Sequence, residues 1–226
     1  SRASLVEGDI TLDGLGIESS ARTALLPRLQ SVFHLAAVYD LGVAEEFARK
    51  VNVTGTRNMI AFAKAAPGFK RFHHVSTAYV GGIRKGIAPE ASLTHTVDWR
   101  AEYEAAKSAR TRVELESRQP EALRQHLAKA RARHGKTGPQ AVAGFAEAAR
   151  SEWVRERLFD YSRTRTESLG WTDVYTLTKA FAERAAEELW SQAGHRLSVV
   201  RPSIIESALH HPFPGWIDGF KVADPL

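Results

Sequence analysis

Apolar residues gather into three short runs along the chain, with long helical patterns between them. The runs cover residues 32–37, 72–76 and 197–201, and the last one stops at Pro202. Short apolar runs that contain Val or Phe and end at turn residues are typical of buried strands. We therefore expect three strands joined by helices.

The segments between these runs have the spacing of helices. Residues 43–66 place apolar positions at helical intervals before Pro67, and a second helix is expected from a cap at Thr172 or Asp173 to Gly194. Strands that alternate with helices pair in parallel through right-handed crossovers. The pattern predicts the α/β class with a parallel sheet.

Residues 84–170 interrupt this alternation. The segment is rich in Ala, Arg and Glu and has few apolar anchors, and residues 135–139 break it into pieces. We interpret it as a helical insertion at the rim of the sheet. The domain boundaries that follow are 1–83 together with 171–226 for the α/β domain, and 84–170 for the insertion.

The most informative positions are Tyr175 and Lys179 on the second expected helix. Residues four apart lie on one helical face, and this pair falls at the edge of the apolar stripe. On the same helical wheel Thr176 and Glu183 fall in the charged arc. An ammonium next to a phenol favours the phenolate and lowers its pKa, which would suit Tyr175 to acid–base catalysis. The alternative is a chance pair on an amphipathic helix.

Hydroxyl and small residues follow the expected strands. Ser76 and Thr77 come after the second run, and Ala36 and Ala37 end the first. Carboxyl ends of parallel strands border the ligand crevice of an open sheet, where either hydroxyl can hold a substrate oxygen. A strand-end cap for the hydroxyls and tight packing for the alanines remain open as structural alternatives.

Composition narrows the possible classes. The 226 residues contain no cysteine, so disulfide scaffolds, thiolate zinc sites and cysteine nucleophiles are excluded. The His residues have no metal-ligand spacing, so we expect no metal. The net charge is +5, and residues 100–165, with 15 Lys or Arg and 9 Asp or Glu, carry all of the excess. A basic segment with interleaved acids favours a solvated face over nucleic-acid binding.

The order of these motifs resembles an extended short-chain dehydrogenase/reductase, and more narrowly a bacterial fatty acyl-CoA reductase. The matching motifs are His34-Leu35-Ala36-Ala37, Asn52-Val53-Thr54-Gly55-Thr56, Val75-Ser76-Thr77-Ala78-Tyr79, Tyr175-Thr176-Leu177-Thr178-Lys179, Arg201-Pro202-Ser203-Ile204 and Pro214-Gly215-Trp216-Ile217-Asp218. The resemblance covers nearly the whole chain, although the insertion matches more by position than by motif. It implies a partial doubly wound, Rossmann-type parallel sheet with a helical insertion.

The resemblance implies a role for each matching position. Tyr175 is the proton donor, Lys179 binds the ribose and adjusts the phenol, and Thr77, with Ser76 as its neighbour, orients the substrate. The other implied positions are Asp9 and Ile10 beside the adenine, Ala36 and Ala37 beside the cofactor, Asn52 in support of the site, Pro202, Ser203, Ile204 and Ile205 over the nicotinamide, and Trp216 on the substrate side.

One family feature is missing from the sequence. No Gly-x-x-Gly-x-x-Gly follows a strand and opens a helix, and the chain does not begin with Met. We therefore expect a fragment of a longer protein that lacks the phosphate-binding loop and, taken alone, binds the dinucleotide poorly.

The resulting expectation is an NADPH-dependent reductase that converts a fatty acyl thioester, on coenzyme A or an acyl carrier protein, to aldehyde or alcohol. The alternatives are a sugar-nucleotide epimerase or dehydratase with the same Tyr/Lys pair, and a catalytically silent scaffold. The basic insertion would attract coenzyme A phosphates, an acidic carrier protein or a membrane. We expect a cytoplasmic protein, with peripheral membrane association as the open alternative.

Overall fold

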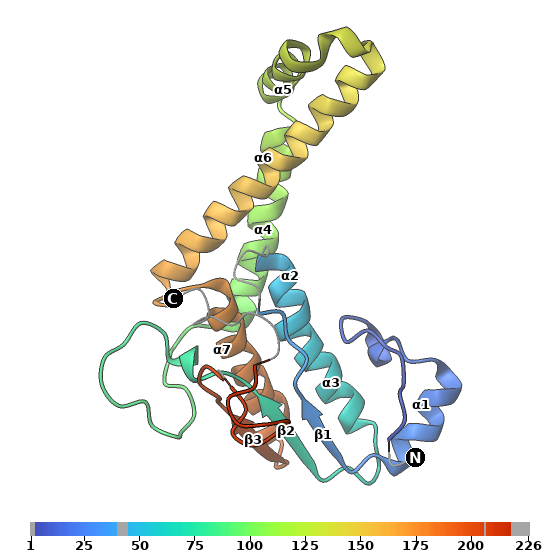
Figure 1. Ribbon diagram of the computed structural model, residues 1–226, viewed down its shortest axis with the longest axis vertical. Coiled ribbons are helices and arrows are strands. Elements are labelled where there is room, and N and C mark those ends of the chain that lie inside the picture. The colour runs from blue at the N-terminus through green and yellow to red at the C-terminus, as the bar shows by residue number, and fades with distance from the viewer. Residues whose placement is uncertain (1–2, 40–44, 206, 218–226) are drawn as a thin grey trace.

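The computed structural model describes residues 3–39, 45–205 and 207–217. Its centre is a parallel three-stranded sheet in the order β1-β2-β3 (Figure 1). The strands are β1 (Ser31–His34), β2 (Arg71–Val75) and β3 (Arg196–Val200). The α/β class and parallel pairing predicted from the apolar runs are confirmed, although β1 ends before Ala36.

Helices alternate with the strands as predicted. They are α1 (Ser19–Leu25), α2 (Glu45–Arg49), α3 (Gly55–Lys64), α4 (Trp99–Ser117), α5 (Pro120–His134), α6 (Pro139–Ser168) and α7 (Val174–Ala186), with π-helical turns η3 (Lys50–Thr54) and η6 (Glu187–Ser191). The run from α2 through η3 to α3 is the helix expected from residues 43–66, whose beginning lies outside the described residues. The cap of α7 is Asp173, whose side chain accepts a hydrogen bond from the amide of Thr176 at 2.8 Å.

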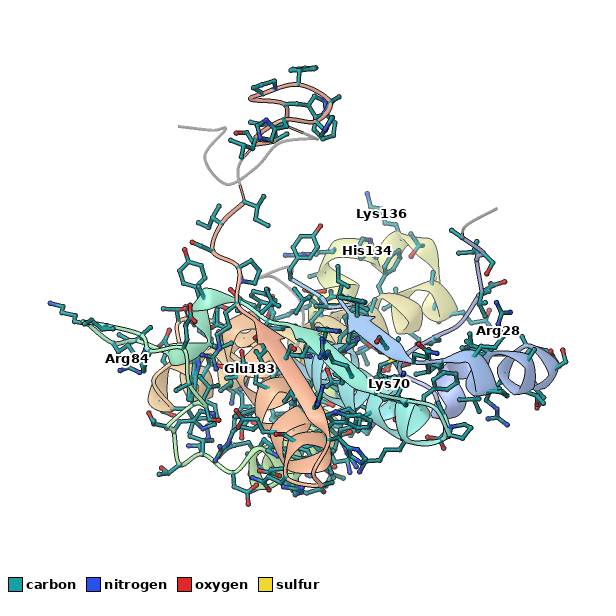
Figure 2. The ribbon with its side chains drawn as sticks, turned by 90° about the horizontal axis from the view of Figure 1, so that it is seen from below. Arg28, Lys70, Arg84, His134, Lys136 and Glu183 are labelled. Carbon is teal, nitrogen blue, oxygen red and sulfur yellow. The ribbon has the colours of Figure 1, made fainter. Side chains whose placement is uncertain are left out.

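Helices α3 and α7 cover one face of the sheet (Figure 2). Alternate side chains of β1 and β2, such as Val32 and Phe72, are buried against them together with Trp190 of η6. The opposite face presents Phe33, which is 67% exposed and stacks on His73 with ring centroids 4.3 Å apart. Burial therefore alternates along these strands, and the buried positions include the polar residues His34 and His74.

Residues 84–170 contain α4, α5 and α6, which form an arm that projects from the sheet domain (Figure 1). A buried cation, Arg150, links α4 to α6 within the arm. Arg150 of α6 is 5% exposed and donates to Ser117 Oγ at 2.7 Å and to Glu114 Oε2 at 3.0 Å, both on α4, and it pairs with Glu147 on its own helix. Division of the chain into a sheet domain and an inserted arm remains our proposal.

Replacing Arg150 with Ala should loosen the arm without disturbing the sheet. The loss leaves Ser117 and Glu114 of α4 without their buried partner, so amide hydrogen exchange in the C-terminal half of α4 should accelerate about 10- to 100-fold, whereas α7 should keep its protection. Arg155→Ala is the matched control, since Arg155 is 67% exposed and pairs only with Glu152 on its own helix. Equal exchange rates in the two variants would contradict this account of the arm.

Candidate active site

The carboxyl ends of all three parallel strands lie along the same side of the sheet, which we call its carboxyl edge. Two backbone hydrogen bonds extend the pairing of β2 and β3 beyond the strands, from Ser76 N to Val200 O at 2.7 Å and from Ala78 N to Pro202 O at 2.9 Å. The segments that follow the strands therefore lie side by side, as the parallel order requires. These segments contain most of the residues that the sequence singled out.

Tyr175 lies in the first turn of α7, facing this edge, and its side chain is half-buried. Burial raises the pKa of the Tyr175 phenol above its usual value, a hydrogen-bonding interaction with Thr77 opposes that rise, and the charge of Asp173 adds to it. The structure therefore brings Tyr175 and Thr77 together. A phenol in this environment is protonated at neutral pH, which suits a proton donor.

The base of the arm determines where Thr77 and Tyr175 sit. Trp171, between α6 and α7, is 3% exposed, and its indole N–H donates to Val80 O at 3.0 Å. Gly82 approaches the same region so closely that a Cβ there would lie 2.5 Å from Gly170 O, and its φ of +73° also favours glycine. The turn after β2 and the start of α7 are thus packed against a common tryptophan, which belongs to the core.

Lys179 lies one turn further along α7 and is only 2% exposed. Its ammonium donates to Val75 O, the last residue of β2, at 2.6 Å. Burial lowers the pKa of Lys179 to about 8, while the charge of Glu183 opposes this change. Lys179 is not among the groups that shift the pKa of Tyr175, and that pKa is raised. The expected lowering of the phenol pKa by the ammonium is therefore not seen here.

Asn52 joins the helix side of the site to the loop after β1. Its Oδ1 accepts from Val38 N at 2.8 Å, while its Nδ2 donates to Val38 O at 3.1 Å and to Thr178 Oγ1 at 2.9 Å. Asn52 lies in the π-helical turn η3, a type of irregularity that is frequent at functional sites. Through Thr178, this side chain braces the turn of α7 that carries Lys179.

Two buried histidines lie under Lys179, and the sequence reasoning did not identify them as part of the site. His34 of β1 and His74 of β2 have ring centroids 5.6 Å apart, and burial followed by the charge of Lys179 lowers the pKa of both, to about 4 for His34. Both rings are therefore neutral at pH 7. His34 Nε2 contacts Thr56 Oγ1 at 2.9 Å, whereas neither ring nitrogen of His74 has a partner among the described residues.

The helical wheel placed Glu183 and Thr176 in the charged arc of α7, outside the buried stripe, and for these two residues that separation was wrong. Glu183 is fully buried, and Thr176 is 5% exposed. The reason is Arg201, which follows β3 and forms a close ion pair with Glu183, with Nη2 and Oε2 2.7 Å apart. Only the partner from a distant strand makes burial of the carboxylate acceptable.

Several features of this edge fit the nicotinamide end of a dinucleotide. Ser76 is 3% exposed, and its Oγ is buried without a partner among the described residues. The ammonium of Lys179 has three donors, and among the described residues one of them bonds to Val75 O. Ala36 and Ala37 follow β1, where Ala36 is exposed and Ala37 is partly exposed.

Asp9 and Ile10 lie against α3 rather than at the strand ends. Ile10 fills the space beside Gly55, where a Cβ would lie 2.6 Å from Ile10 Cδ1, and Asn58 donates to Ile10 O at 2.9 Å. The carboxylate of Asp9 accepts from Thr11 N at 2.8 Å, and this bond is the main reason that the pKa of Asp9 is lowered. The turn is thus held firmly to the helix that follows Asn52.

The remaining predicted positions follow β3. Pro202 lies at the edge beside Ala78, while Ser203, Ile204 and Ile205 are exposed. Trp216 is 37% exposed and belongs to the segment 207–217, which lies apart from the sheet (Figure 2). The structure does not bring Trp216 into contact with Tyr175 or Thr77. Asp218, the last residue of its motif, lies outside the described residues.

Comparison with known families accounts for this arrangement. The family model described as "Male sterility protein" matches residues 1–226. The chain belongs to the male sterility protein family. Membership in a family with an NAD-binding domain supports a nicotinamide dinucleotide as the cofactor.

Curated relatives of this male sterility family chain include reductases from plants. It is 26% identical over 221 residues to "Fatty acyl-CoA reductase 2, chloroplastic" of Arabidopsis thaliana, covering 98% of the chain and 32% of the relative. It is 27% identical to "Alcohol-forming fatty acyl-CoA reductase" of Simmondsia chinensis, covering 99% of the chain and 40% of the relative. The chain thus spans between a third and two-fifths of the length of these relatives.

A solved structure supports the fold. The terminal R domain of the myxalamid PKS-NRPS biosynthetic pathway matches 89% of this male sterility family chain and 33% of its own length, with a TM-score of 0.50 and 17% identity. At this identity the likeness concerns the fold alone, and it agrees with the partial Rossmann-type sheet.

Asn52→Ala should destabilise the site region. It removes three hydrogen bonds and leaves both backbone groups of Val38 unpaired, so the free energy of unfolding should fall by about 2–4 kcal/mol in urea denaturation. Asn58→Ala is the control: Asn58 is the same residue type and bonds Ile10 and Leu12 at a more exposed position. The Asn58 variant should lose about 1 kcal/mol. A loss no larger at Asn52 than at Asn58 would contradict the bracing role.

Proposed function

We propose that the protein containing this chain reduces a fatty acyl thioester with NADPH. The proposal rests on the meeting of the Tyr175 phenol with the Thr77 hydroxyl at the carboxyl edge of the sheet, above the buried ammonium of Lys179. Fatty acyl-CoA reductases among the relatives supply the substrate class.

The residues at the edge fit the ribose and nicotinamide part of the cofactor. Lys179 would donate to the ribose, Ser76 has a buried hydroxyl without a partner, and Pro202 begins the loop that would lie over the nicotinamide. The sequence has no Gly-rich loop for the pyrophosphate, so we propose that the phosphates bind residues beyond these 226. When bound, NADPH supplies a hydride to the carbonyl carbon of the substrate.

The side chains of this chain perform the other half of the reaction. Thr77 donates a hydrogen bond to the carbonyl oxygen of the thioester, which orients it and stabilises the charge that develops there. Tyr175 transfers its proton to the same oxygen as the hydride reaches the carbon. Cleavage of the carbon–sulfur bond then releases the aldehyde and the thiol, and a second reduction would yield the alcohol.

Tyr175→Phe should abolish most of the activity of the full-length protein. Removing the proton donor should reduce kcat for acyl-CoA-dependent NADPH oxidation about 10²- to 10⁴-fold, and Thr77→Val should reduce it about 10²-fold. Absorbance at 340 nm reports the reaction.

Tyr79→Phe provides the matched control, because Tyr79 lies in the same turn as Thr77 but is 50% exposed. Its turnover should equal that of the unmodified protein. Turnover of a sugar nucleotide without net consumption of the dinucleotide would favour an epimerase instead. If Tyr175→Phe leaves the measured activity unchanged, a catalytic role for the phenol is rejected.

We further propose that the end of the arm contacts a membrane that contains anionic lipids. Residues 118–138, which comprise α5 and its flanking turns, contain six Lys or Arg and one acid, so their net charge equals the +5 of the whole chain. Lys129, Arg131, Arg133 and Lys136 are exposed, and none has an ion pair within the described part of the chain. Figure 2 shows Lys136 pointing outward from the arm.

The length of the arm excludes a direct effect of these cations on substrate at the sheet edge. Helix α6 has 30 residues, so it extends about 45 Å, several times the screening length of about 10 Å at moderate salt. These cations must therefore act on a surface that contacts the tip of the arm, residues 118–138. Each Lys or Arg near an anionic bilayer contributes about 1 kcal/mol. Within the described residues, no helix has both the length and the apolar content needed to cross a bilayer.

Replacing the four unpaired cations of the tip with Gln should reduce cosedimentation with vesicles of phosphatidylcholine and phosphatidylglycerol by about 10³-fold in affinity. Arg110, Arg155, Arg157 and Arg163 are the control set, because each pairs with a carboxylate elsewhere on the arm or at its base. Their joint replacement should retain most of the binding. Equal binding to neutral vesicles, or binding of an acidic carrier protein in place of vesicles, would overturn this proposal.

A further inference from the structure

A buried charged column runs through α7 behind the proposed site. Tyr175, Lys179 and Glu183 are spaced four residues apart, so they follow one another along one helical face. Lys179 is 2% exposed and Glu183 is fully buried, and Figure 2 shows Glu183 on the helix side of the sheet. Burial of a lysine and a glutamate is costly unless each has a compensating partner.

Arg201 compensates for Glu183. Its Nε donates to Oε1 at 3.0 Å and to Oε2 at 3.2 Å, and its Nη2 donates to Oε2 at 2.7 Å and to Ala91 O at 3.0 Å. The pairing raises the pKa of Arg201, chiefly through the hydrogen bonds from Glu183. The guanidinium therefore stays charged, and the carboxylate is held in one place between β3 and α7.

Glu183 is in turn the group that favours the charged form of Lys179. The groups facing Lys179 from the other elements are His34 of β1 and His74 of β2, which are neutral at pH 7 because burial lowers their pKa values. Burial alone favours the uncharged amine, and the charge of Glu183 is what opposes it, leaving the pKa of Lys179 at about 8. No ion pair within 4 Å joins Lys179 to Glu183 among the described residues, so the influence acts through space.

We propose that Glu183, held by Arg201, is a positioning residue that keeps Lys179 protonated at neutral pH, and that the balance between Glu183 and Arg201 sets the alkaline limit of the activity. The inference rests on the proposed reductase function. Tyr175 titrates above its usual range, so it does not set that limit. The same pair anchors Pro202, the residue that follows Arg201 and bonds the turn after β2.

Two substitutions should move the pH profile of kcat/KM in the same direction. Glu183→Gln removes the negative charge, so the alkaline limb should move to lower pH by about one unit and activity at low pH should be largely retained. Arg201→Gln removes the partner that keeps the buried carboxylate of Glu183 charged, so the alkaline limb should also move to lower pH. Glu183→Asp keeps the negative charge, so the alkaline limb of its pH profile should lie close to that of the unmodified protein.

Arg184→Gln is the control, since Arg184 is also a cation of α7 but lies partly exposed and pairs with Glu187. The alkaline limb of the pH profile of this variant should not move. A purely structural role for the Glu183–Arg201 pair predicts that both variants lower Tm and reduce kcat/KM equally at every pH, and that result would overturn the inference.

A direct titration separates this inference from the proposed activity. The Lys179 ¹³Cε resonance, assigned with Lys179→Arg in the full-length protein, should titrate near pH 8 and shift to lower pH in Glu183→Gln. If no acyl thioester is reduced, the proposed function fails, while this titration still tests the electrostatic role. An unchanged Lys179 titration in both the Glu183 and the Arg201 variants would reject that role.

Discussion

The hydrogen bond from the Lys179 ammonium to the carbonyl of Val75 connects the helix that carries the phenol to the strand that carries the hydroxyl. Because Lys179 is buried, its charge has to be stabilised by groups that the fold supplies, and these are the carbonyl of Val75 and the charge of Glu183, which Arg201 holds in place. Movement of α7 along the sheet would break this bond and separate Tyr175 from Thr77. The geometry of the site therefore depends on the electrostatics beneath it.

The irregular parts of the fold strengthen the same region. The π-helical turn η3 directs Asn52 toward both Val38 and Thr178, and Trp171 packs the base of the arm between the turn after β2 and the start of α7. The arm is thus attached close to the point where the hydroxyls of Tyr175 and Thr77 meet. Its far end carries the net positive charge of the chain and lies about 45 Å away by the length of α6. The fold consequently places the strand ends that carry Tyr175 and Thr77 far from the basic surface at the end of the arm.

Much of the core pattern could be predicted because it is local. The apolar runs identified the three strands to within a few residues, and the acidic cap at Asp173 identified the start of α7. Glu183 was misplaced because a helical wheel describes one helix, whereas its burial depends on Arg201, 18 residues further along the chain. Likewise His34 and His74 are ordinary strand residues in the sequence, and only the parallel register of β1 and β2 places them together under Lys179.

The sequence by itself determined the class of fold, the order of the strands and helices, and the residue types at the strand ends, because periodicity and turn residues act over a few positions. The tertiary structure alone decided that Tyr175 would remain a protonated phenol beside Thr77, and that Lys179 would bond to β2. It also decided that a carboxylate would lie fully buried between an arginine and a lysine. The pKa of a side chain depends on burial and on charges brought from distant segments, and these are defined only once the chain has folded.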